Sequence, residues 1–264
     1  MLSEKYNSGS LLNKYRPTTL SEVRGQPAAV GQLSSFVASI EDCPTSAVFL
    51  FHGPTGVGKT ASAHALAGDL GCDIDHEELG GLHELPSGQQ DGQAVVDLMR
   101  LLRLRPMFGS GWKVAIVNEA DTMTAGAAAM WLDALEHLPP KTVLIFTTND
   151  MGRLPARFLG RCELVPFSGD SSEFSSALFA LVREIWRKET GKLLRWVPED
   201  TGRIEQCDPT LSIRLAIQQI APYLRSGKKL PKKFICPLVR SDNPGREAAQ
   251  KAWATRRRKA VSNG

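Results

Sequence analysis

The sequence contains no long apolar run, and none of its stretches approaches the ~18 residues that a membrane-spanning helix needs. Residues 1–11 lack the apolar segment of a secretory signal. We therefore expect neither a signal peptide nor a membrane anchor, and no membrane partner.

Cysteine is also scarce. The five cysteines are scattered and odd in number, which favours free thiols in a reducing compartment. No C-x-x-C pair or cluster of histidine and cysteine has the spacing of a zinc site, and His76 and His83 are read as loop residues. Internal repeats and the spacing of a helix-turn-helix or zinc finger are missing too. We expect a cytoplasmic protein, nucleoid-associated if bacterial or viral, without sequence-specific readout of DNA.

Positive charge is distributed unevenly along the chain. The formal net charge is +4, but residues 225–264 hold 12 Lys and Arg against two acidic residues. The remainder holds 20 basic residues against 26 acidic ones. The sequence therefore predicts a mildly acidic globular body with a basic tail. The length suits one large domain or two modest ones.

One glycine-rich stretch fits G-x-x-x-x-G-K-[ST], the loop that holds nucleotide phosphates. It reads Gly53-Pro54-Thr55-Gly56-Val57-Gly58-Lys59-Thr60. An apolar run precedes it and a small-residue segment follows, so it has the strand–loop–helix context that the motif requires. Backbone N–H groups and the helix N-terminus would face phosphate oxygens. Lys59 would reach the β- and γ-phosphates, and the Thr60 hydroxyl would hold Mg²⁺.

Apolar runs alternate with helix-sized segments through the first two thirds of the chain. The predicted strands cover residues 47–51, 71–75, 112–117, 143–146 and 163–165. The predicted helices cover residues 26–40, 61–70, 93–104, 124–137 and 155–159, after an extended piece at 12–17. This alternation predicts an α/β fold with a P-loop, doubly wound parallel sheet.

Beyond residue 167 the pattern becomes helical. Helices are predicted over residues 171–190, 198–206 and 209–224, which indicates a small three-helix lid. We therefore divide the chain into an α/β domain (1–167), a lid (168–226) and a basic tail (227–264). The tail contains Trp253 and a possible basic helix over 246–259, so it would suit non-sequence-specific contacts with DNA phosphates. A solvated tail is an equal alternative.

Polar residues end several of the predicted strands. Lys59, Glu119 and Asn149 all fall at carboxyl ends, where parallel sheets bind ligands. Glu119 would polarise the water that attacks the γ-phosphate; the alternative is an ordinary surface acid. Asn149 would hydrogen-bond the γ-phosphate or that water, or it is a simple turn residue. Arg161 and Arg214 suit stabilisation of phosphoryl charge, with surface salt bridges as the alternative.

These motifs together resemble the clamp-loader ATPases of the AAA+ superfamily, such as replication factor C small subunits and the gamma and delta-prime subunits of bacterial DNA polymerase III. The resemblance covers residues 12–220. The matching segments are Lys14-Tyr15-Arg16-Pro17, Val23-Arg24-Gly25-Gln26, the P-loop, Asn118-Glu119-Ala120-Asp121, Thr147-Thr148-Asn149, Gly160-Arg161-Cys162 and Ser212-Ile213-Arg214.

The resemblance implies an ATP-binding, ATP-hydrolysing subunit that uses Mg²⁺ and loads a sliding clamp on DNA within an oligomer of clamp-loader subunits. Arg16, Pro17 and Val23 would join the P-loop in binding the nucleotide, and Thr60 and Asn118 would hold the metal. Glu119, Asn149 and Arg214 would act on the chain's own ATP. Arg161 would act on a neighbour's ATP. An ATP-binding scaffold with little hydrolysis, another AAA+ DNA motor and a helicase loader remain alternatives.

Two departures from the family pattern matter. Asn118 replaces an aspartate, which keeps an oxygen ligand but loses the negative charge, so weaker metal binding or slower hydrolysis follows as a hypothesis. The ~40 residues after the lid are also fewer than the helical collar of such proteins needs. The chain would assemble through its ATPase domain and lid alone, a partner would supply the collar, or the chain is a shortened viral or plasmid-borne relative. Gly160, in place of a serine, puts little in doubt.

Overall fold

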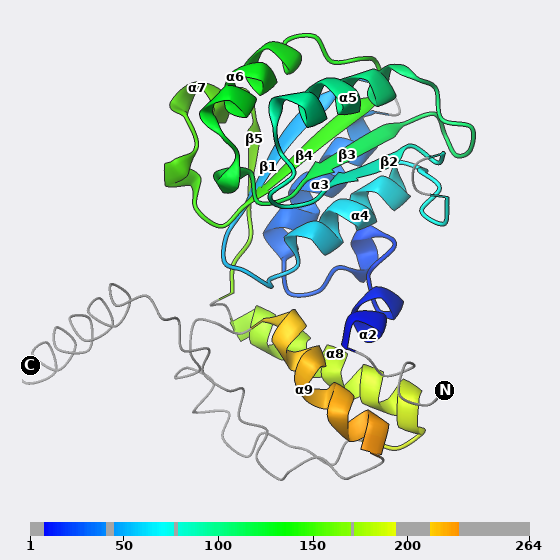
Figure 1. Ribbon diagram of the computed structural model, residues 1–264. Helices are drawn as coiled ribbons and strands as arrows, with labels where there is room; N and C mark the ends of the chain where they lie inside the picture. The colour runs from blue at the N-terminus through cyan, green and yellow to red at the C-terminus, as the bar shows by residue number, and fades with distance from the viewer. Residues whose placement is uncertain (1–7, 41–44, 77–78, 170–171, 194–211, 227–264) are drawn as a thin grey trace, which may run out of the picture. The chain divides into compact units, whose positions relative to one another are not determined.

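The computed structural model of this 264-residue chain describes residues 8–40, 45–76, 79–169, 172–193 and 212–226. A five-stranded parallel sheet forms its centre (Figure 1). The strands are β1 (Ala47–His52), β2 (Leu82–Leu85), β3 (Lys113–Val117), β4 (Thr142–Thr148) and β5 (Glu163–Pro166). Their order is β2-β3-β4-β1-β5. Every residue of β3 and β4 is buried, as expected for central strands covered on both faces. The predicted α/β parallel sheet is confirmed.

Helices cover both faces of the sheet (Figure 1). They are α3 (Pro27–Ser39), α4 (Lys59–Asp69), α5 (Gly92–Arg103), α6 (Ala125–Ala134) and α7 (Ala156–Leu159), with 3-10 turns at Leu20–Glu22, Ala120–Thr122 and Met151–Arg153. On one face, Phe146 of β4 meets Trp131 of α6 and Phe158 of α7 edge-on. On the other, Phe49 of β1 meets Phe36 of α3. The predicted helices in this part of the chain are confirmed, although α6 ends three residues before His137.

The predicted strand over residues 71–75 is wrong. Gly71 takes a left-handed φ of +77°, and the Asp73 carboxylate accepts the backbone N–H groups of Asp75 and His76, so this segment is a turn. The second strand is instead β2, within a polar, glycine-rich segment that gave no clear pattern. It is the outermost strand of the sheet formed by the described residues, and it pairs with β3. A short edge strand needs little apolar sequence, which explains why periodicity missed it.

The predicted extended piece over residues 12–17 is wrong in its first half. A helix, α2, runs from Ser8–Lys14 and buries Leu11 completely. Pro17 restricts the backbone of Arg16 alone, and the helix ends before that residue is reached.

Two further helices follow the sheet. They are α8 (Ser172–Thr190) and α9 (Ile213–Ser226), which pack against each other, and α9 also contacts α2. Their buried apolar residues include Leu178, Val182, Ile185, Ile217, Ile220 and Leu224. The helices predicted near 171–190 and 209–224 are thereby observed.

The helix predicted over 198–206 and the tail from residue 227 lie outside the described residues. The three-helix lid and the three domain boundaries therefore stay predictions. None of the helices in the described ranges is both long and apolar enough to cross a membrane.

Candidate nucleotide-binding site

The glycine-rich loop connects the carboxyl end of β1 to the first turn of α4, which begins at Lys59. Gly56 has a φ of +80°, and a Cβ atom there would lie 1.9 Å from the Ser212 Oγ. The Gly56 carbonyl also accepts the backbone N–H of Ile213 at 3.0 Å. Glycine is therefore needed both for the backbone turn and for close approach of the start of α9. The loop sequence alone predicted only the turn.

Gly56→Ala is expected to destabilise the protein by about 1–3 kcal/mol, because it combines an unfavourable φ with a steric clash against Ser212. Urea unfolding without nucleotide measures this change. The matched control is Gly31→Ala in α3, where a new Cβ has no neighbour within 4 Å; that variant should be neutral or slightly more stable. Equal stability of the two variants would contradict a tight contact between the loop and α9.

Lys59 is buried at the carboxyl edge of the sheet. Its Nζ donates to the carbonyl oxygens of Gly53 and Pro54, at 2.7 and 2.8 Å, and to Asn149 Oδ1 at 2.9 Å. Burial lowers the pKa of the ammonium from 10.5 to about 8, although Asp121 and Glu119 nearby favour its charged form. The geometry thus brings Lys59 and Asn149 together, as their positions at strand ends predicted.

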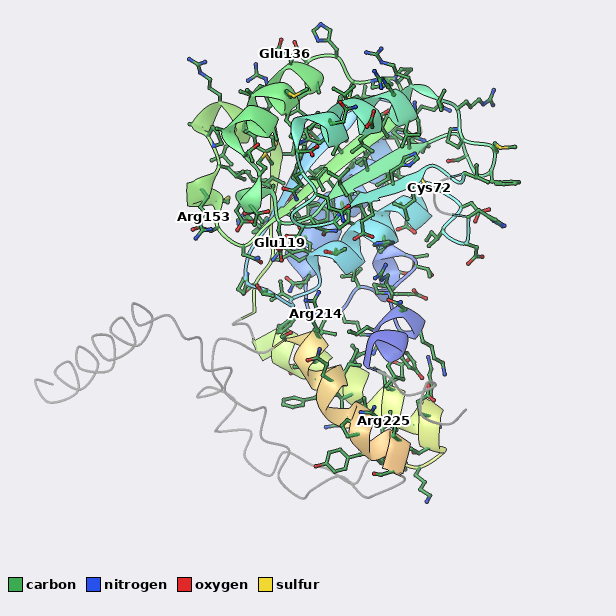
Figure 2. All side chains as sticks on the ribbon, viewed as in Figure 1. Cys72, Glu119, Glu136, Arg153, Arg214 and Arg225 are labelled. Atoms are coloured by element: carbon green, nitrogen blue, oxygen red, sulfur yellow. The ribbon has the colours of Figure 1, made fainter. Side chains whose placement is uncertain are left out.

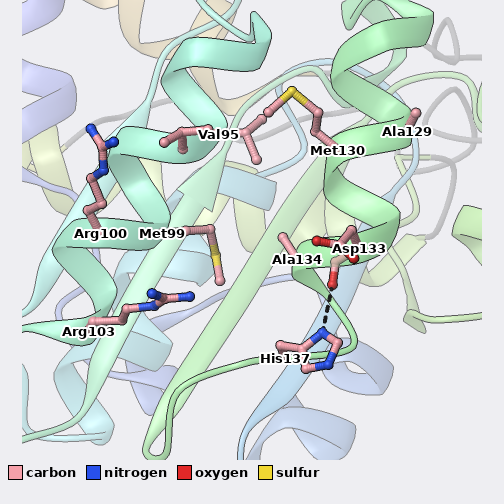
Figure 3. A pocket seen from close by; sticks show the side chains of 10 residues that line it. Val95, Met99, Arg100, Arg103, Ala129, Met130, Asp133, Ala134 and His137 are labelled. Carbon is pink, nitrogen blue, oxygen red and sulfur yellow. Dashed lines mark hydrogen bonds between the residues drawn. The ribbon is translucent and has the colours of Figure 1, made fainter.

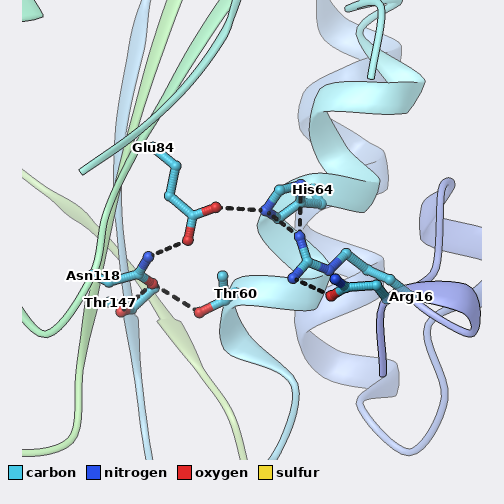
Figure 4. Close-up of polar contacts among 7 residues, drawn as sticks. Arg16, Thr60, His64, Glu84, Asn118 and Thr147 are labelled. Atoms are coloured by element: carbon cyan, nitrogen blue, oxygen red, sulfur yellow. Dashed lines mark hydrogen bonds and ion pairs between the residues drawn. The ribbon is translucent and has the colours of Figure 1, made fainter. Parts of the chain in front are cut away.

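Thr60 and Asn118 also meet at this edge. The Thr60 hydroxyl donates to Asn118 Oδ1 at 2.8 Å, and the Thr147 hydroxyl approaches the same oxygen at 3.3 Å (Figure 4). No group of three or more His, Cys, Asp and Glu residues that could hold a metal ion occurs within the described ranges. Two neutral oxygens fit Mg²⁺ only as part of a set completed by phosphates and water, which is how this ion is commonly bound.

Glu119 follows Asn118, two residues after the end of β3 (Figure 2). It has a left-handed φ of +52°, which is uncommon for a residue other than glycine and marks a constrained position. Its backbone N–H donates to the Thr147 hydroxyl at 3.1 Å, and its carboxylate accepts the Ser87 hydroxyl. Glu119 is therefore held through its backbone by the end of β4 and through its carboxylate by Ser87, and its charge influences Lys59.

The two arginines lie in different places. Arg214 is exposed in the first turn of α9, near enough to Lys59 to help lower the pKa of its ammonium. Arg161 instead pairs with Glu136 and donates to the Arg157 carbonyl at 3.2 Å, just before the amino end of β5. Parallel strands place their amino and carboxyl ends at opposite edges, and Figure 2 shows Glu136 well away from Glu119. Arg161 is therefore remote from this chain's own P-loop.

The opening motif reaches the site indirectly. The Arg16 guanidinium lies 3.0 Å from His64 Nε2, which in turn lies 3.1 Å from Glu84 Oε2 (Figure 4). Pro17 and Val23, in the segment that connects α2 to α3, are partly buried. The roles of Arg16, Pro17 and Val23 at a nucleotide stay predictions.

Several site residues escaped the sequence reasoning. Gln26 is buried and joins the loop to the end of β5, donating to the Val57 carbonyl at 3.3 Å and the Ser168 carbonyl at 2.7 Å. Glu84, His64 and Ser87 were missed because they act through neighbouring strands and helices rather than through a motif. Gln26 stood in the opening motif, which was the only available signal.

A hollow of about 600 Å³ lies between α5 and α6 and shares no residue with the P-loop (Figure 3). Arg100 and Arg103 lie along it, opposite Asp133 and His137. Arg100 pairs with Asp97 on its own helix at 3.1 Å.

Known proteins resemble this chain in sequence. A family model described as DNA polymerase III, delta subunit, matches residues 86–171. The replication factor C small subunit of Methanosarcina barkeri is 32% identical over 61% of this chain and 47% of its own length. That of Thermoplasma acidophilum is 30% identical over 84% of this chain and 66% of its own. The chain is thus related in sequence to the clamp-loader ATPases.

The similarity covers only part of each relative. The chain spans about half to two thirds of the length of these replication factor C small subunits. A structure of Thermotoga maritima RuvB aligns with 81% of the present chain, and the alignment covers 68% of the RuvB chain. Its TM-score is 0.55 at 19% identity, so it supports the fold alone.

Proposed function

We propose that this chain is an ATP-binding and ATP-hydrolysing subunit of a clamp-loader assembly, which uses ATP to load a sliding clamp on DNA. The observation that carries the proposal is the cluster at the carboxyl edge of the sheet. There the buried Lys59 ammonium lies within hydrogen-bond distance of the loop carbonyls and of Asn149. The relationship to replication factor C subunits supports the choice of clamp loading over other uses of a P-loop.

Binding would exchange contacts that already exist. Lys59 would turn its ammonium from the carbonyls of Gly53 and Pro54 to the β- and γ-phosphates, which supply negative charge that the carbonyls lack. Thr60 and Asn118 would present their side-chain oxygens to Mg²⁺. The ion, when bound, would offset the negative charge of the phosphates.

Hydrolysis would need three further groups. Glu119 would accept a proton from the attacking water, and Asn149, already beside Lys59, would orient that water or the γ-phosphate. Arg214 would approach the same phosphate from α9. Arg161 would serve the site of an adjacent subunit, since it lies at the opposite edge of the sheet from Lys59.

An ATP-binding scaffold with slow turnover is the second candidate. Asn118 favours it, because a neutral amide stands where clamp loaders usually carry an aspartate and its oxygen holds Mg²⁺ less strongly than a carboxylate. In this case nucleotide binding, rather than hydrolysis, would set the state of the assembly.

One assay separates the two candidates. Phosphate release from ATP is measured alone, with primed DNA, with a candidate sliding clamp and its partner subunits, and with all of them together. We expect the combination to raise turnover at least ten-fold above the protein alone. Retention of ATP with no stimulation would favour the scaffold. Failure to retain adenine nucleotide at any magnesium concentration would contradict both.

A further inference from the structure

We propose that Glu84 is the positioning residue that adapts this site to an asparagine at position 118. It orients the Asn118 amide toward the metal position and supplies, one hydrogen bond farther out, the negative charge that this position lacks. This inference rests on the proposed binding of ATP with Mg²⁺.

The orientation follows from donor and acceptor chemistry. Asn118 Nδ2 lies 2.6 Å from Glu84 Oε1, and a carboxylate can only accept hydrogen bonds. The nitrogen end of the amide must therefore face Glu84, because the reversed amide would place two oxygens against each other. Asn118 Oδ1 is then directed to the Thr60 hydroxyl, 2.8 Å away, where the metal is expected (Figure 4).

Within Asn118, the Glu84 carboxylate contacts the side-chain amide and leaves the backbone to other partners. The Asn118 backbone is held separately, because its N–H donates to the Leu85 carbonyl at 3.0 Å and its carbonyl accepts from Gln90. Losing the Glu84 carboxylate would leave these bonds and the β2–β3 pairing in place. What it would remove is the constraint on the amide and the charge beside it.

The charge on Glu84 is maintained by its other neighbours. Two basic side chains lie on its other side: His64 Nε2 is 3.1 Å from Glu84 Oε2, and the Arg16 guanidinium lies 3.0 Å from the same nitrogen. His64 is almost fully buried and fixes the second carboxylate oxygen, while 33% of the Glu84 side chain remains exposed. Partial exposure screens the charge, so a moderate effect on metal binding is expected.

The experiment compares Glu84→Gln with a variant that exchanges the two groups, Glu84→Gln/Asn118→Asp. The exchange moves the carboxylate to position 118 and keeps an amide–carboxylate pair. Affinity for a fluorescent ATP analogue is measured with Mg²⁺ and with EDTA, so the ratio reports the metal-dependent part of binding. Partners that orient a ligand in this way are worth about ten-fold or more in metal affinity.

We expect Glu84→Gln to lower the Mg²⁺-dependent gain in affinity about ten-fold and to leave affinity in EDTA within about two-fold of wild type. The exchanged variant should recover to within about three-fold of wild type. The change Asn118→Asp should favour Mg²⁺-dependent binding more when Gln rather than Glu occupies position 84, since two adjacent carboxylates repel. Glu163→Gln, an exposed strand residue of β5, is the matched control and should change nothing.

The outcomes separate this inference from the proposed function. If wild type binds no nucleotide, the proposed function fails and the inference fails with it. If wild type binds with a strong Mg²⁺ dependence but Glu84→Gln is unchanged, or weakens binding equally in EDTA, the inference alone is wrong. Thermal unfolding of each variant checks its fold. If Glu84→Gln does not fold, the comparison of the exchanged variant with wild type decides. Failure of the exchanged variant to recover the Mg²⁺-dependent gain in affinity would then overturn the inference.

Discussion

Lys59→Met is expected to abolish nucleotide binding and, at the same time, to make the nucleotide-free protein more stable at pH 7. The first effect follows because Lys59 is the one buried cation among the described P-loop residues. The second follows from the cost of burying its charge, which lowers the pKa of the ammonium from 10.5 to about 8. The penalty is about 3 kcal/mol, and three lost hydrogen bonds of roughly 0.5–1 kcal/mol each offset most of it, so the gain should be about 1 kcal/mol.

The lowered pKa also predicts how the stability difference between Lys59→Met and wild type changes with pH. In the unfolded chain the lysine keeps its proton up to about pH 10.5, whereas in the folded protein it loses it near pH 8. The penalty is therefore complete below pH 8 and fades between pH 8 and 10.5. The stability advantage of Lys59→Met should shrink across that window, as urea unfolding at pH 7 and pH 10 would measure.

The control is Lys192→Met, which removes an exposed lysine. It should leave nucleotide affinity unchanged and show no such pH-dependent gain. A Lys59→Met protein that is less stable than wild type at pH 7 would contradict the account. Affinity for ATP within ten-fold of wild type would exclude Lys59 as the residue that contacts phosphate.

Arg161→Ala is expected to lower ATP turnover by about a hundred-fold or more without weakening nucleotide binding to the same chain. The reason is its location, paired with Glu136 at the amino edge of the sheet while Lys59 lies at the carboxyl edge. An arginine so placed can reach only a phosphate held by another subunit. Arginines of this kind contribute about 10³–10⁵-fold to turnover where they have been measured.

Mixing two inactive variants tests this action between subunits. Arg161→Ala keeps its P-loop, and Lys59→Met keeps its arginine, so a mixed assembly contains some complete sites. We expect the mixture to recover activity that neither variant shows alone. Arg157→Ala, an exposed neighbour on α7, is the control and should behave as wild type. A mixture with no recovery, or a loss of affinity in Arg161→Ala itself, would contradict the prediction.

Much of the fold could be predicted because its information is local. The runs that became β1, β3 and β4 are almost wholly apolar, and the loop before Lys59 follows a motif with a defined backbone. Parallel strands then place Lys59, Glu119 and Asn149 at one edge, and the structure confirms that Lys59 contacts Asn149.

The remaining features depend on which segments become neighbours. Glu84 meets Asn118 only because β2 lies beside β3, and no pattern in the sequence reveals that order. The contact of Ser212 with Gly56 joins segments about 150 residues apart. In the sequence its one indication is the glycine itself, which the P-loop motif already explains. Short polar elements such as β2 carry too few apolar residues to be recognised.

The contact between the loop and α9 has a mechanical consequence. The Gly56 carbonyl accepts the Ile213 N–H, and its bare α-carbon abuts Ser212. A loop that shifts to accommodate phosphates must therefore either break this bond or carry the beginning of α9 with it. Since α9 packs against α8 and α2, a displacement of the Gly56 carbonyl would tilt α9, which is several turns long, relative to these two helices.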